Sequence, residues 1–231
     1  MSEGLEKSID YAGYDIAVVK EQRLKEILDP TRSALLVVDL QNDFISPEGK
    51  ATTLWHQNVA PMQAILPKIE RVEEQFYRLA RPVIRTVVYE DPELRTEAGR
   101  DRFIFFEDGD REGEVACLKG TPGADLYKPA KEGDIILEKT RASAYSGTKL
   151  HEIIEKEGLK TIFIVGIKTQ RCVRRTVEDL YENEPDLHVV VLEDCVASDD
   201  IDQHESAISE LKKFWPPVIT SEELFEHWKN T

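Results

Sequence analysis

The sequence has little of several features that would point to other classes of protein. Only three of its 231 residues are cysteine, and they show no pairing pattern, so no disulfide framework is expected. The N-terminus lacks the basic start and apolar core of a secretion signal, and no apolar run approaches the roughly 20 residues of a membrane span. Basic residues are also few, 30 against 45 acidic ones, and the net charge of −15 opposes binding to nucleic acid or to anionic membranes. We therefore predict a cytoplasmic protein whose partner is a small molecule.

The chain also lacks signs of division into several domains. It contains no Gly/Ser-rich linker, internal repeat or low-complexity tract, and its length suits one sizeable core. We predict a single domain over residues 31–231, preceded by an N-terminal extension over residues 1–30.

Short apolar runs rich in β-branched residues alternate with helical patterns, which is typical of a parallel sheet covered on both faces. We expect strands over Ala34–Asp39, Pro82–Val88, Asp134–Leu137, Thr161–Val165, His188–Leu192 and Pro217–Ile219. Helical spacing predicts helices over 58–80, 147–157, 172–183 and 202–214, and Thr220–Glu223 has the spacing of a capping box. This alternation predicts an α/β fold, an α/β/α sandwich that binds ligands at the carboxyl ends of its strands.

Residues 89–120 interrupt this alternation. The segment is charged, contains glycine and carries an aromatic cluster at Phe103–Phe106. Long irregular connections are usually functional, so one interpretation is a lid over the substrate. The other is a surface excursion whose aromatic side chains fill the core or a subunit contact.

Three side chains that could take part in catalysis follow three of the expected strands: Asp39, Lys139 and Cys172. Singly each has an ordinary explanation, as a turn former, a solvated lysine or a small buried hydrophobe, and the last also suits Cys117 and Cys195. Together they form a nucleophile, its base and a charge partner. Asp39 would take the thiol proton, Lys139 would hold the acid and the thiolate, and the thiolate would attack a carbonyl to give a covalent acyl-enzyme.

Cys172 lies in an elbow between a strand that breaks at Gly166 and the helix that follows. A thiol with a pKa of about 8.5 is mostly protonated at neutral pH, so a catalytic cysteine needs a helix N-terminus or nearby cations to lower its pKa. The elbow and the helix start supply four cations, Lys168, Arg171, Arg174 and Arg175. We therefore expect a lowered thiol pKa, and backbone N–H groups of the elbow that stabilise an oxyanion.

Five motifs carry a resemblance to a known family. In chain order they are VVDLQNDF, GTPGADL, EKTRASAYSGTKL, GIKTQRCVRRTVEDL and VLEDCVASDDIDQHESAISEL, and they resemble the isochorismatase-like cysteine hydrolase superfamily over residues 31–225. The resemblance implies a three-layer α/β/α sandwich with a six-stranded parallel sheet in the Rossmann-like order 3-2-1-4-5-6. It also implies a catalytic triad of Asp39, Lys139 and Cys172, and a homodimer or homotetramer.

Within this superfamily the sequence favours one type of reaction. Nicotinamidases carry an Asp-x-His metal motif after the second strand, whereas this chain has Tyr89-Glu-Asp-Pro92, so we predict no metal and no cofactor. Isochorismatases proper cleave a vinyl ether without a cysteine nucleophile. The Thr169-x-x-Cys172-Val173 pattern resembles the C–N hydrolases, such as the N-carbamoylsarcosine, ureidoacrylate and biuret amidohydrolases. We predict a metal-independent cysteine hydrolase of a small amide, carbamoyl or ureido substrate. The alternatives are a vinyl-ether hydrolase in which Asp39 protonates the substrate, and a catalytically silent scaffold.

The elbow departs from the family pattern. The resemblance implies a cis peptide bond that joins Ile167 to Lys168 or Lys168 to Thr169. Relatives have an uncharged residue before this threonine and Asp or Asn after it, whereas this chain has Lys168 and Gln170, and Arg171 adds a further cation. One interpretation is a carboxylate-bearing substrate bound by Arg171 or Lys168, with Thr169 also in the substrate site. The other is a basic helix start that faces solvent.

Four more residues are expected to meet over the crevice: Gln41, Phe44, Trp55 and Tyr145. Aromatic side chains there would sandwich a planar amide or ureide. Core packing or a dimer contact is the alternative for Trp55 and Tyr145. His204 is expected to pack on its helix rather than act as a catalyst.

Overall fold

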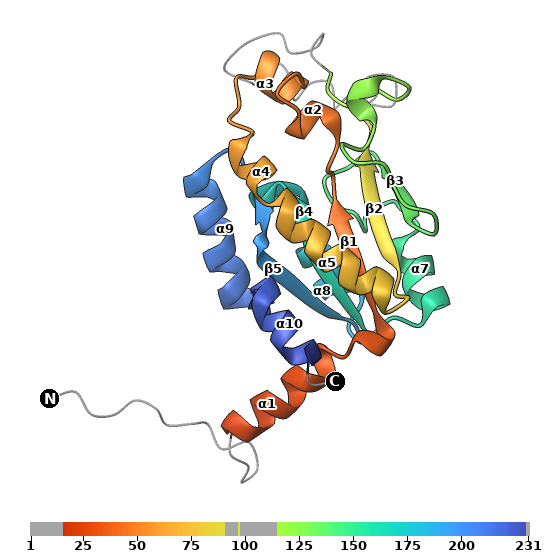
Figure 1. Ribbon diagram of the computed structural model, residues 1–231, viewed down its shortest axis with the longest axis vertical. Helices are drawn as coiled ribbons and strands as arrows, with labels where there is room; N and C mark the ends of the chain where they lie inside the picture. Colours follow the sequence, from red (N-terminus) through yellow and green to blue (C-terminus); the bar gives the residue numbers. More distant parts are fainter. Residues whose placement is uncertain (1–15, 91–96, 98–114, 230–231) are drawn as a thin grey trace, which may run out of the picture.

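A computed structural model describes residues 16–90, 97 and 115–229 (Figure 1). Most of the segment over 89–120, including the aromatic cluster at Phe103–Phe106, lies outside the described residues, as does the first half of the predicted extension.

Six parallel strands form one sheet in the order β3-β2-β1-β4-β5-β6, which is the predicted order. The strands are β1 (Ser33–Val38), β2 (Val83–Val88), β3 (Ile135–Lys139), β4 (Thr161–Ile167), β5 (His188–Ala197) and β6 (Val218–Ile219). Because all of them run the same way, their carboxyl ends meet at one edge of the sheet, where a ligand is expected.

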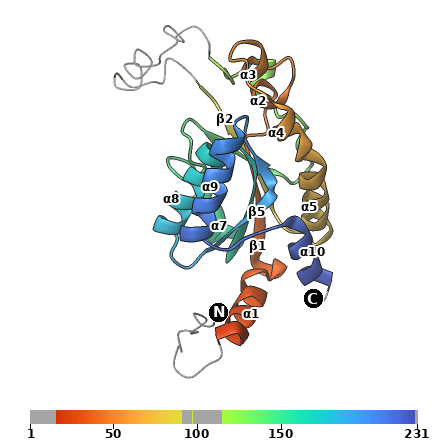
Figure 2. The ribbon, with the colours of Figure 1, turned by 90° about the vertical axis from the view of Figure 1, so that its left-hand side faces the viewer.

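Helices cover both faces of this sheet, and Figure 2 shows the three layers edge-on. The helices are α1 (Ile16–Ile27), α2 (Asn42–Ile45), α3 (Lys50–Thr53), α4 (Ala60–Ala64), α5 (Leu66–Arg78), α7 (Leu150–Glu157), α8 (Arg174–Asn183), α9 (Ile201–Phe214) and α10 (Ser221–Lys229). None of the helices in the described part of the chain is long and apolar enough to cross a membrane.

The central strand β1 shows how one apolar run serves two cores. Leu35 and Val37 pack into the cluster that contains α4, α5 and α10, whereas Leu36 and Val38 pack into the cluster that contains α7, α8 and α9. Side chains alternate across a strand, so a strand between two helical layers has to be apolar at every position. The predicted α/β/α sandwich is confirmed.

The structure corrects several predicted boundaries. The long helix expected over 58–80 is two helices, α4 and α5, because Pro67 has no N–H to bond to the carbonyl four residues earlier. Strands β4 and β5 continue past their expected ends, since Gly166 and Ile167 remain paired with Val196 and Ala197. Strand β3 reaches Lys139 itself, so this lysine belongs to the sheet and not to a loop.

The C-terminal capping box is confirmed. The N–H of Thr220 donates to Glu223 Oε2 at 2.7 Å, and the N–H of Glu223 donates to Thr220 Oγ1 at 3.2 Å. The helix that follows, α10, then packs Leu224 and Phe225 onto the sheet.

Candidate active site

Asp39 is the first residue beyond β1, at the carboxyl edge of the sheet. It is buried, and its backbone has a positive φ of 53°, a conformation that Asp tolerates better than most residues. Thr86 of β2 fixes the carboxylate: its hydroxyl donates to Asp39 Oδ1 at 2.5 Å, and the Asp39 N–H donates back to the same hydroxyl oxygen at 3.0 Å. Sequence reasoning missed Thr86, although a polar residue inside the apolar run of β2 was a usable signal.

Lys139 reaches Asp39 across the intervening strand. It lies beside Val88 of β2, and its buried ammonium is 2.8 Å from Asp39 Oδ2. The ammonium also donates to the carbonyls of Arg141 and Ala142 at 3.0 Å each, so two hydrogen bonds and the ion pair with Asp39 hold it in place. Burial opposes the charged form, but the Asp39 carboxylate and the nearby thiol outweigh it and raise the pKa of Lys139. The lysine is therefore a fixed positive charge.

Cys172 lies in a π-helical turn, Thr169–Val173, between β4 and α8. Its side chain is partly exposed, whereas Cys117 and Cys195 are buried. Burial, and next the Asp39 carboxylate, raise the pKa of the Cys172 thiol to about 12, against the opposing effect of Lys139 and Arg171. This corrects the expectation of a lowered pKa, because burial, and next the Asp39 carboxylate, outweigh the effect of the cations on the thiol.

One oxygen of the Asp39 carboxylate is available to accept a proton. Asp39 Oδ1 accepts from Thr86, whereas the buried Oδ2 receives no aligned hydrogen bond from the described residues, although Lys139 lies close to it. A neutral thiol beside an ionised carboxylate can give up its proton as it attacks an electrophile. The arrangement can therefore generate a thiolate when a substrate is present and does not need to store one.

The other residues of the elbow face different neighbours. The Lys168 ammonium is 2.8 Å from Asp199 Oδ1 and donates to Gln57 Oε1 at 2.7 Å. The Thr169 hydroxyl is hydrogen-bonded to His204 Nδ1 at 2.8 Å. Both side chains therefore bind protein groups, and the hydrogen bond of Thr169 joins the elbow to His204 of α9. The peptide bond between Ile167 and Lys168 is cis, the first of the two positions that the resemblance implied.

The three arginines of the elbow and helix start differ in their partners. Arg174 pairs with Glu178 and Glu210, and Arg175 pairs with Glu178 and Asp179. Arg171 is exposed and has no ion-pair partner among the described residues.

Gln41 holds the backbone at the edge of the site. Its amide N–H₂ donates to the carbonyls of Val88 at 3.0 Å and Ala124 at 2.8 Å, and its amide oxygen accepts from the Val88 N–H at 2.8 Å. The structure thus places this predicted substrate-binding group in contacts that connect the ends of β1 and β2 to the 122–124 turn.

Of the three predicted aromatic residues, Phe44 and Trp55 lie together and Tyr145 lies elsewhere. Phe44 and Trp55 pack together with Tyr89 against a small cluster formed by Ala116, Cys117 and Ala124. Trp55 lies two residues before Gln57, which contacts the elbow, and its buried indole N–H has no partner in the described part of the chain.

Tyr145 is not brought to the thiol. Its hydroxyl donates to Glu184, just beyond the end of α8, whereas Cys172 precedes the start of that helix. The ten residues of α8 span about 15 Å. The Tyr145 hydroxyl therefore points toward the C-terminal end of α8 and not toward the thiol.

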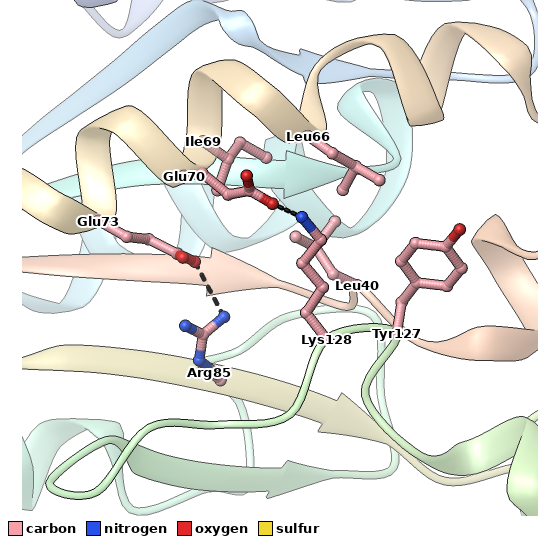
Figure 3. A pocket seen from close by; sticks show the side chains of 8 residues that line it. All are labelled: Leu40, Leu66, Ile69, Glu70, Glu73, Arg85, Tyr127 and Lys128. Carbon is pink, nitrogen blue, oxygen red and sulfur yellow. Dashed lines mark ion pairs between the residues drawn. The ribbon is translucent and has the colours of Figure 1, made fainter.

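A hollow, shown in Figure 3, lies beneath α5, and none of the three candidate residues lines it. Its polar floor is Arg85, which pairs with Glu73 at 2.9 Å and, beyond the hollow, with Asp134 at 2.6 Å. Lys128 pairs with Glu70 at its rim. Since these charges neutralise one another, the hollow is a poorer candidate than the edge beside Cys172.

The described residues contain no group of three His, Cys, Asp or Glu side chains that could hold a metal ion. The residues that directly follow β2, Tyr89 and Glu90, offer one carboxylate and no imidazole.

Comparison with known proteins gives consistent matches. The model of the isochorismatase domain matches residues 33–223. A probable inactive nicotinamidase of Arabidopsis thaliana is 32% identical over 84% of this chain and 95% of its own length. The N-carbamoylsarcosine amidase of Arthrobacter is 29% identical over 64% of this chain and 53% of its own. The crystal structure of an isochorismatase family protein from Desulfovibrio vulgaris superposes with a TM-score of 0.69 and 25% identity, covering 84% of this chain and 97% of the other.

Proposed function

Because the chain belongs to the isochorismatase family, we propose that it is a metal-independent cysteine hydrolase that cleaves a C–N bond of a small amide, carbamoyl or ureido substrate through an acyl-enzyme on Cys172. The observation that carries the proposal is the buried contact of Lys139 with Asp39 at 2.8 Å beside the partly exposed thiol. An amidase among the relatives supports the type of bond.

The first half of the reaction forms a thioester. Asp39 Oδ2 takes the proton of the Cys172 thiol while the sulfur attacks the substrate carbonyl carbon. The resulting oxyanion is stabilised by backbone N–H groups at the start of the Thr169–Val173 turn, because the first N–H groups of a helical turn point toward its N-terminal end. When the tetrahedral adduct collapses, the C–N bond breaks, and the leaving nitrogen takes the proton that Asp39 holds.

The second half returns the enzyme to its starting state. Asp39, again ionised, takes a proton from a water molecule whose oxygen attacks the thioester carbon. The C–S bond then breaks, the acid product leaves, and the proton returns from Asp39 to the sulfur. Lys139 keeps its charge throughout and holds the carboxylate in place while its charge changes.

Two alternatives assign other roles to Cys172. In a vinyl-ether hydrolase, Asp39 would protonate the substrate and Cys172 would be dispensable. In a silent scaffold no substrate would react, and the probable inactivity of the Arabidopsis relative keeps this alternative relevant. The Asp39–Lys139 contact beside the thiol favours an active hydrolase.

The Cys172→Ala variant separates these functions. The proposal expects a loss of turnover on the order of a thousandfold or more, as for other nucleophiles, in a variant that folds normally. Retained activity would support the vinyl-ether reaction, and an inactive wild type would support the scaffold. A chelator should leave wild-type turnover unchanged, and a loss that added zinc restores would contradict metal independence.

The location and the oligomeric state of the enzyme are two further parts of its function. All three thiols are free, which suits a reducing compartment, so we propose a cytoplasmic location. We also propose a homodimer or homotetramer, which analytical ultracentrifugation would distinguish from a monomer.

A further inference from the structure

The elbow that holds Cys172 contains one cation with no ion-pair partner among the described residues. Of the four cations at the elbow and helix start, Lys168 is paired with Asp199, Arg174 with Glu178 and Glu210, and Arg175 with Glu178 and Asp179. Only Arg171 lacks such a contact within the described ranges. The region is therefore not uniformly basic, because carboxylates form ion pairs with its other three cations.

Arg171 lies next to the candidate nucleophile. It directly precedes Cys172 in the same turn, and its N–H donates to the Lys168 carbonyl at 3.0 Å. Its guanidinium is exposed, yet near enough to the sulfur to favour the thiolate. In a chain with a net charge of −15, an unpaired guanidinium beside a nucleophile is a local exception.

Lys168 is the other cation that could bind an anion, and its contacts argue against it. Its ammonium donates to Gln57 Oε1 and lies beside the Asp199 carboxylate, so a substrate carboxylate would have to displace one of them. Its contacts also join the elbow to the loop of Gln57 and to the loop before α9. Lys168 is therefore a positioning residue.

We propose that Arg171 is a specificity-determining residue that binds a carboxylate of the substrate, so that the enzyme acts on small amides, carbamoyl compounds or ureides that carry an anionic group. This inference rests on the proposed function. A guanidinium forms two parallel hydrogen bonds with a carboxylate, which would hold the substrate beside the sulfur.

A matched pair of alkylating agents tests Arg171 without requiring a known substrate. Iodoacetate and iodoacetamide transfer similar groups to a thiol, but only iodoacetate carries a carboxylate. The measurement is the ratio of their rate constants at Cys172, followed by peptide mass spectrometry, in the wild type, Arg171→Gln and Arg175→Gln. The ratio cancels changes in thiol pKa, and Arg175→Gln removes the same unit of charge from the adjacent helix.

The iodoacetate-to-iodoacetamide ratio is expected to fall about tenfold in Arg171→Gln, the effect of losing one charge-assisted contact, and to stay near the wild-type value in Arg175→Gln. An unchanged ratio in Arg171→Gln would overturn the proposal. Equal falls in both variants would also overturn it, because they would show a general effect of charge.

Turnover distinguishes failure of this inference from failure of the proposed function. Ammonia release is measured from the monoamide of succinic acid and from its uncharged methyl ester. A lower KM for the anion in the wild type, lost in Arg171→Gln, agrees with the inference. Turnover of both with no such preference overturns the inference alone. If neither these nor other amides or ureides are turned over, the proposed function fails, and the alkylation ratio still decides whether Arg171 binds a carboxylate.

Discussion

At the scale of single residues, the site depends on the Asp39 carboxylate beside the Cys172 thiol. Burial, and next the nearby carboxylate, raise the pKa of the thiol to about 12. The thiol is therefore neutral in the resting enzyme.

Replacing Asp39 by Asn should have opposite effects on two reactions of Cys172. Loss of the negative charge lowers the thiol pKa, so the midpoint of the alkylation rate against pH, measured with iodoacetamide, should move to lower pH. Amide turnover should disappear, because no base remains to pass the proton to the leaving nitrogen. If the midpoint stays or rises, the assigned coupling is wrong.

Stability and activity should separate at the Asp39–Lys139 pair. Both groups are buried, so a single Asp39→Leu or Lys139→Met change leaves an unpaired buried charge and should cost roughly 3–5 kcal/mol of the free energy of unfolding. The double variant removes both charges and should recover most of this loss while remaining inactive. Urea denaturation with an activity assay checks both; a double variant that loses the sum of the single costs would contradict the account.

Single residues also show what the sequence could reveal about the site. Asp39, Lys139 and Cys172 were identifiable from their positions at strand ends together with the motifs. Thr86 was not identified, because its role depends on the register that brings it beside Asp39, a residue 47 positions away in the sequence. Gln41 is predicted to bind substrate, whereas its amide bonds to backbone groups of Val88 and of the 122–124 turn, which sequence spacing does not locate.

At the scale of elements, the close approach of β1 and β4 positions the site. Gly166 lies beside Val38, the residue before Asp39, and has a φ of 114°. A Cβ at this glycine would lie 2.3 Å from the Val38 carbonyl oxygen and 2.6 Å from its nitrogen. These are backbone atoms, which cannot move without displacing Asp39.

Gly166→Ala should therefore both destabilise the fold and impair the site. Overpacking and the positive φ together should cost roughly 3 kcal/mol or more, and the folded fraction should show a lower kcat. Gly120→Ala is the control, since Gly120 also has a positive φ, of 84°, but a Cβ there meets nothing within 4 Å. Similar unfolding midpoints for the two variants in thermal melts would refute the steric explanation.

Element boundaries were less predictable than element order. The order of strands follows from the alternation and the resemblance, whereas the ends of β4 and β5 depend on pairing that continues past the apolar runs. The break between α4 and α5 could have been read from Pro67, whose missing N–H interrupts an otherwise continuous helical pattern.

At the scale of the whole molecule, the candidate site and helix α1 lie at opposite ends of the sheet (Figure 1). The segment that follows α1 contacts the core: Leu28 is buried, and its carbonyl accepts from the Trp228 indole N–H at 2.7 Å. The Ile27 carbonyl accepts from the Thr161 hydroxyl at 2.8 Å. We propose that residues 1–30 are an N-terminal extension and that its last residues stabilise the hydrolase domain.

Deletion of residues 1–30 should thus lower stability and leave catalysis intact. Loss of the buried Leu28 side chain and of two hydrogen bonds should reduce the free energy of unfolding by roughly 3 kcal/mol. The value of kcat/KM per folded molecule should not change, because Leu28 and the two hydrogen bonds lie at the amino ends of the strands, away from Cys172. A folded but inactive truncated protein would show that the extension contributes to the site.

The central claim is that Cys172 carries the acyl group, and intact-protein mass spectrometry tests it most directly. The wild type, Cys172→Ala and Cys117→Ala are each mixed briefly with a panel of small amides, carbamoyl compounds and ureides. The reactions are quenched in acid, and the mass of each intact protein is measured. We predict an added acyl mass on the wild type and on Cys117→Ala, mapped to the peptide of Cys172, and none on Cys172→Ala. Turnover of a substrate by Cys172→Ala at the wild-type rate, with no adduct on any of the three proteins, would contradict the account.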